Sequence, residues 1–217
     1  WGISPCSANK QLSTIFTKEK EGTRMLTIPQ LTEKMIAFSA GNTADIHHFL
    51  CVWAYAKTIG EAEGLDEKTQ FLLEATAILH DISCPLCREK YGNTDGKHQE
   101  AESPRLVQGF LADSGFDAAL IDRISYLIAH HHTVTGIDGM DYQILVEADF
   151  LVNYFEDGLD KEHIKKSAEK IFKTETGKKI VKDMFFPKTF QKSETWAQDA
   201  LQDLEDFIEE QGIYIRQ

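Results

Sequence analysis

The segment FLLEATAIL, at residues 71–79, constrains the fold more than any other part of the sequence. Its residues are apolar on nearly every side of a helix, and Leu65-Asp66-Glu67 before it is a typical helix start. The sequence therefore predicts one helix over residues 65–81. A helix that is apolar all round is buried on most sides, so other elements must surround this one.

The rest of the chain repeats its apolar residues at helical spacing, and the alternation typical of strands is scarce. A polar connection with Pro85, Gly92 and Gly96 interrupts this pattern over residues 82–103, and loops of this length are often functional. We expect further helices over residues 29–38, 45–59, 103–114, 117–131, 141–155, 160–173, 176–186 and 194–210. The fold class that follows is an all-α, single-domain helical bundle.

The sequence contains no internal repeat, low-complexity tract or linker, so we expect one helical domain over residues 25–217. Its core motifs lie in residues 42–157, and C-terminal helices occupy residues 158–217. Residues 1–24 are expected to be a dispensable extension, because Met25 opens the segment MLTIPQLTEKMI like a natural start.

The composition excludes several classes of protein. The formal net charge is −12 at pH 7, which disfavours binding to a nucleic acid polymer through its phosphates. No run of about 18 apolar residues exists, so we expect no membrane span. Four cysteines in a chain of 217 residues make no disulfide framework, which fits a cytoplasmic protein.

Two of the cysteines form a C-x-x-C motif, Cys84 and Cys87. A zinc ribbon needs a second such pair, which the sequence lacks. A redox pair usually opens a helix in a βαβ unit, and the sequence shows no such unit. We therefore interpret them as ordinary loop cysteines. Cys51 lies in an apolar helical pattern and is expected to be a small buried residue.

Of the eight histidines, seven fall between residues 47 and 132. His80 and Asp81 end the predicted apolar helix, so both side chains should lie inside the protein or at the floor of a cleft. A buried carboxylate is costly unless a cation or several hydrogen bonds meet it. The alternative is that His80 only caps the C-terminus of its own helix.

Two other helices carry polar groups in apolar surroundings. His48 shares a helix face with Val52 and Ile59, and Asp149 is embedded in ILVEADFLVNYF. Imidazole and carboxylate groups together are common ligands of a divalent transition metal. Three separate helices that each offer such a ligand indicate a metal site.

These residues resemble the H…HD…D signature of the HD-domain superfamily of metal-dependent phosphohydrolases. The resemblance covers about residues 42–157, and it implies that His48, His80, Asp81 and Asp149 bind a divalent metal within an all-α fold. His48 is preferred over His47 because the family places Val four residues after the ligand, as Val52 stands here.

Two further histidines suggest a second metal. By resemblance, members with two metals place a fifth ligand before a helix, where His98 stands; its alternative is a solvated loop residue. The run His130-His131-His132 ends a predicted helix. At 100° per residue, His131 falls within the apolar stripe of that helix, so we select it as the sixth ligand.

The resemblance also implies a mechanism. Asp81 would bridge two ions, with His48, His80 and Asp149 on one and His98 and His131 on the other. Metal-bound water would be the nucleophile, and His80 and Asp81 are the catalytic candidates. The site would hold one or two divalent ions, of Fe, Mn, Ni, Co or Zn. The substrate would be a small anionic phosphate ester of the nucleotide type, with Arg88, Lys90 and Lys97 as candidate phosphate contacts.

Two other functions remain open. The same ligand pattern resembles the di-iron oxygenases of the superfamily, such as myo-inositol oxygenase, and a degenerate HD fold could serve as a regulatory or binding module. Hydrolysis of cyclic dinucleotides is not expected, because the segment HHHTVTGIDG lacks the Glu and the GYP of the HD-GYP subgroup. The acidic amphipathic tail over residues 194–210 is expected to pack on the domain; the alternative is that it mediates a homodimer.

Overall fold

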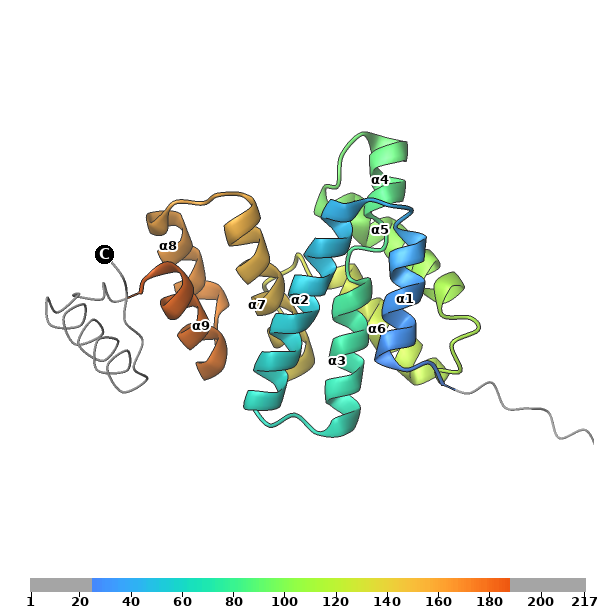
Figure 1. Cartoon of the computed structure of the whole chain (residues 1–217), viewed down its shortest axis with the longest axis horizontal. Coiled ribbons are helices and arrows are strands. Elements are labelled where there is room, and N and C mark those ends of the chain that lie inside the picture. The colour runs from blue at the N-terminus through green and yellow to red at the C-terminus, as the bar shows by residue number, and fades with distance from the viewer. Residues whose placement is uncertain (1–24, 188–217) are drawn as a thin grey trace, which may run out of the picture. The chain divides into compact units, whose positions relative to one another are not determined.

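A computed structural model describes residues 25–187, and these form nine α-helices with no strand among them (Figure 1). The all-α prediction is therefore confirmed. The helices, in chain order, are α1 (Ile28–Phe38), α2 (Thr43–Ala62), α3 (Glu67–Leu79), α4 (Cys84–Tyr91), α5 (Gly96–Phe110), α6 (Ala118–His130), α7 (Met140–Glu156), α8 (Lys161–Ile171) and α9 (Glu175–Phe185).

Contacts between residues group the helices into two compact units. The first unit contains α1, the beginning of α2 as far as Leu50, α3 from Phe71 onward, and helices α4 to α6. The second contains the rest of α2 from Cys51, the first turn of α3 as far as Gln70, and helices α7 to α9. The predicted division into a dispensable extension and one helical domain stays a prediction.

Helix α3 supplies the centre of the first unit. All eight residues from Leu72 to Leu79 are buried, which confirms that this helix is covered on most sides. Helix α1 begins with a capping box, in which the Thr27 and Gln30 side chains each accept from the other's backbone N–H. Its buried residues Leu31 and Met35 lie one turn apart on one face.

The predicted loop over residues 82–103 is wrong, because two helices occupy most of it. Pro85 lies in the first turn of α4, where its missing N–H costs nothing, and Gly92 ends that helix with a φ of 74°. Pro104, which we expected to start a helix, lies inside α5. Cys84 and Cys87 are thus helical residues and not loop residues.

Helix α7 is the buried centre of the second unit. It carries the fully buried Glu147, whose carboxylate accepts hydrogen bonds from the backbone N–H of Lys173 at 2.6 Å and of Thr174 at 3.0 Å. Gln143, one turn earlier, donates to the same carboxylate at 2.8 Å. Glu147 therefore fixes the connection between α8 and α9 against α7.

None of the helices within residues 25–187 is long and apolar enough to cross a membrane. The predicted extension over residues 1–24 and the predicted helix over residues 194–210 lie outside the residues that the structure describes.

Candidate metal centre

His80 is the first residue after α3, and its ring is held by its own helix. Its Nδ1 lies 2.7 Å from the carbonyl oxygen of Ala77, three residues earlier. Because a carbonyl only accepts, Nδ1 carries the proton and Nε2 carries a lone pair. His80 is fully buried, so this lone pair faces the protein interior.

His131 repeats this arrangement at the end of α6, where it is the C-cap residue. Its Nδ1 lies 2.7 Å from the carbonyl oxygen of Ile128, again three residues earlier, so its Nε2 also carries a lone pair. The side chain is fully buried, whereas the neighbouring His132 is exposed. Burial therefore agrees with the helical angle that selected His131 from the three.

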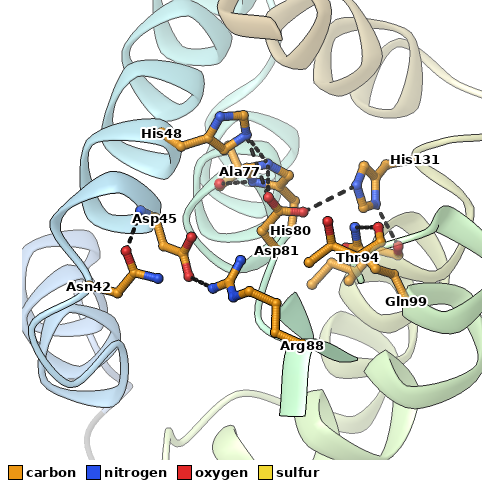
Figure 2. A network of polar contacts seen from close by, with 11 residues as sticks. Asn42, Asp45, His48, Ala77, His80, Asp81, Arg88, Thr94, Gln99 and His131 are labelled. Carbon is orange, nitrogen blue, oxygen red and sulfur yellow. Dashed lines mark hydrogen bonds and ion pairs between the residues drawn. The ribbon is translucent and has the colours of Figure 1, made fainter. Parts of the chain in front are cut away.

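Asp81 and three imidazoles converge in the first unit (Figure 2). The Nε2 atoms of His48 and His80 lie 3.1 Å apart. One carboxylate oxygen of Asp81 lies 3.6 Å from Nε2 of His48 and 3.8 Å from Nε2 of His80. The other lies 3.7 Å from Nε2 of His131.

These separations fit a bound divalent cation. Nitrogen and oxygen ligands bind such an ion at about 2.0–2.2 Å, so two ligands of one ion lie about 3–4 Å apart. Two imidazole nitrogens at 3.1 Å, one of which presents a lone pair, need either a proton or a cation between them. The donor set of imidazoles and one carboxylate is suited to Mn, Fe, Co, Ni or Zn.

The charge state of Asp81 also suits this role. Burial by itself raises the pKa of Asp81, but the imidazole of His80, the hydrogen bond and charge of His131 and the charge of His48 together lower it well below its usual value. The side chain keeps 24% of its surface exposed, so it can also meet a molecule from outside. Asp81 is therefore an anion that lies within reach of the three rings.

Cys84 lies against this carboxylate but has different chemistry. Burial, and then the negative charge of Asp81, raise the pKa of the Cys84 thiol far above its usual range. A thiol that stays protonated is neither a good metal ligand nor a redox nucleophile.

Cys51, which we expected to be buried, is exposed on α2, so that prediction is wrong. Its side chain faces away from the apolar side of α2 that Val52 and Ala56 occupy.

Asp45 and Arg88 form an ion pair beside the cluster, and sequence reasoning did not identify this pair (Figure 2). Asp45 lies on α2 three residues before His48, and Arg88 lies on α4 four residues after Cys84. The spacing of three residues between Asp45 and His48 could have predicted that they share one helix face. The pairing itself was not, because it joins residues that are 43 positions apart in the sequence.

His98 lies in the first turn of α5, with Nδ1 2.9 Å from the side-chain oxygen of Asn93 and its ring stacked on Tyr91 at 3.9 Å. Asp149 is buried on α7, in the second unit, with 3% of its surface exposed. The assignment of both as metal ligands stays a prediction. His130 is turned to its own helix, with Nδ1 2.7 Å from the carbonyl oxygen of Tyr126.

Comparison with known proteins yields one family. The family model described as HD domain matches residues 45–174, which is more than half of the chain. The fold resembles the crystal structure of a predicted HD superfamily hydrolase from an uncultured Thermotogales bacterium, with a TM-score of 0.53 and 22% sequence identity. That match covers 86% of this chain and 94% of the other. No curated protein matches the chain.

Proposed function

Because the chain belongs to the HD domain family, we propose that it is a metal-dependent phosphohydrolase that acts on a small phosphate ester of the nucleotide type. The observation that carries this proposal is the convergence of Asp81 with the Nε2 atoms of His48, His80 and His131 at separations of 3.6–3.8 Å. A divalent cation would give all four groups one common partner.

The proposed ligands are His48, His80, Asp81 and Asp149 for a first divalent ion. His131 and His98 would belong to a second, with Asp81 shared between the two. The carbonyl oxygens of Ala77 and Ile128 hold two of the imidazoles with Nε2 towards the cluster, which supports their role as ligands. This preorganisation lowers the cost of assembling the site.

A divalent ion in such a site lowers the pKa of a bound water towards neutrality and neutralises charge on a phosphoryl oxygen. The task of the protein is to hold the reacting groups in place. Asp81 is kept ionised and lies within reach of the three rings, so it would help to hold the ion. Its side chain is also partly exposed, so it could orient an incoming water molecule. His80, buried at the C-terminal end of α3, would hold its imidazole on the interior side of the cluster.

Arg88 is the strongest of the three candidate contacts for the substrate phosphate. It lies beside the cluster on α4, and its side chain is 41% exposed although it pairs with Asp45. Lys90 is held by Glu102 at 2.5 Å, which leaves it less available. The net charge of −12 favours a small anion over a polyanion at the site, since a long anionic chain would meet the acidic surface. A cytoplasmic location belongs to the same proposal.

The test is the substitution Asp81→Asn, which keeps the shape of the side chain and removes its charge. We expect metal content, measured by elemental analysis, to fall from one or two ions per chain towards zero, and phosphate release with Mn²⁺ to be lost. Chelation should lower the melting temperature of the unmodified protein, because an ion that binds only the folded state at 100 times its Kd stabilises it by about 2.7 kcal/mol. Chelation should not change the melting temperature of the variant.

The matched control is Asp113→Asn, since Asp113 is an exposed aspartate of the same unit and its ion pair with Lys34 lies away from the cluster. This variant should keep its metal and its activity. Full metal content in Asp81→Asn would contradict the proposal. Protein that holds iron as purified, gives a mixed-valent EPR signal and releases no phosphate would instead indicate an oxygenase.

A further inference from the structure

The second unit contains a hollow between α8 and α9 that the metal centre does not use. Its volume is about 380 Å³, which is at the small end of the range for binding pockets. The floor is apolar and consists of Ala168, Phe172, Val181 and Phe186. The rim is mainly basic and consists of Lys165, Lys178, Lys182 and Glu169. The hollow can therefore take apolar side chains from an acidic segment.

The basic rim is only partly neutralised by its own unit. Lys165 and Lys182 are exposed and form no ion pair with another residue of the described range 25–187. Lys178 pairs with Glu175, three residues earlier, at 2.8 Å, and both side chains are largely exposed. Exposed pairs of this kind are weak, so Lys178 can also meet another carboxylate.

The chain itself contains a segment with the complementary pattern. Residues 194–210 contain seven acidic residues and no Lys or Arg. At 100° per residue, Trp196, Leu204 and Phe207 fall within 80° of one another on a helix. Ala200 falls inside this stripe and Ile208 extends it. All seven acidic residues fall on the remaining side. A helix over these residues would present an apolar face bordered by carboxylates.

We propose that residues 194–210 dock as an amphipathic helix in the hollow between α8 and α9, with the apolar face on its floor and the carboxylates against its lysines. Phe186 lines the hollow, and only seven residues separate it from Glu194. Seven residues span roughly 25 Å when extended, which exceeds the length of about 16 Å for an 11-residue helix such as α9. The connection is thus long enough for the segment to return along α9.

The test is amide hydrogen exchange of the full chain, read for residues 194–210 by mass spectrometry. In the triple variant Lys165→Glu, Lys178→Glu, Lys182→Glu, we expect exchange in this segment to become about tenfold faster, because three attractions become repulsions. High salt should also speed exchange in the unmodified chain, since these charges are exposed to solvent. Reversal of the facing acids as well, by Asp199→Lys, Asp203→Lys and Asp206→Lys, should restore slow exchange.

The matched control is the triple variant Lys161→Glu, Lys166→Glu, Lys179→Glu. It has the same change in charge on the same two helices, but none of its residues lines the hollow. Exchange in this control should equal that of the unmodified chain. Fast exchange in the unmodified chain, or equal effects of the two triple variants, would overturn the proposal. Protection that grows with protein concentration would also overturn it, in favour of docking between two copies.

Discussion

At the scale of single residues, capping a helix and binding a metal are not alternatives for His80. Its Nδ1 satisfies a carbonyl at the C-terminal end of α3, and its Nε2 faces His48. The sequence was sufficient to predict that His80 and Asp81 need polar or charged partners, because a charge at the end of an apolar helix is costly when it is left unpaired. It could not predict the orientation of His98, which depends on its contacts with Asn93 and Tyr91.

The three adjacent histidines offer a test at the same scale. His131→Ala should reduce metal content and activity far more than His132→Ala, because His131 is buried with Nε2 3.7 Å from Asp81, whereas His132 is exposed. We expect at least a tenfold difference in metal affinity, since even residues that only orient a ligand cost 10–100-fold. Isothermal titration of the metal-free variants measures it. Equal losses would remove His131 from the ligand set.

At the scale of helices, residue patterns with capping signals were predicted well. Asp117 accepts from the backbone N–H of Leu120 at 2.8 Å and begins α6, as the sequence indicated. Helix α4 was missed because it has only eight residues, too few for helical periodicity to give a signal. Pro104 was taken as a helix start because proline is common there, yet α5 continues through it.

The junction between α7 and α9 can be tested with a pair of glycines. A Cβ at Gly177 would lie 2.1 Å from a carboxylate oxygen of the buried Glu147 and 2.7 Å from Oγ1 of Thr174. Gly177→Ala should therefore lower the free energy of unfolding by about 1–3 kcal/mol. Gly109, exposed within α5 with no atom within 4 Å of such a Cβ, should gain about 0.4–1 kcal/mol on replacement by alanine. Urea denaturation measures both, and equal effects would contradict the proposed role of Glu147.

At the scale of the whole molecule, contacts between distant parts of the chain were beyond sequence reasoning. Glu63, the residue after α2, accepts a hydrogen bond of 2.8 Å from the backbone N–H of Thr176 in α9, 113 residues away. The fold class could be predicted because helix periodicity is local. This contact could not, because neither residue lies in a pattern that points to the other.

Glu63 also makes global stability depend on pH. The hydrogen bonds from the side chain and the backbone of Thr176 lower the pKa of Glu63 below its usual value. The ionised form of Glu63 therefore favours the folded state. This contribution is complete above the usual pKa of a glutamate and is lost as the pH falls through the lowered pKa. We expect Glu63→Gln to cost at most ~1 kcal/mol at pH 7 and to cost progressively less towards pH 3.

Urea denaturation at several pH values measures this difference. Glu61→Gln is the control, since Glu61 stands two residues earlier and forms only an exposed ion pair with Lys57. Its effect should stay small throughout. A cost for Glu63→Gln that grows on acidification would contradict the sign.

The carbonyl groups that hold His80 and His131 have a consequence for how this protein can change during evolution. The acceptors are main-chain atoms of Ala77 and Ile128, so the orientation of each ring does not depend on which side chain stands at those positions. Substitutions that keep the helices intact therefore leave the orientation of both imidazole rings unchanged. Divergent descendants can therefore replace most of the surrounding sequence and inherit the same arrangement of histidines.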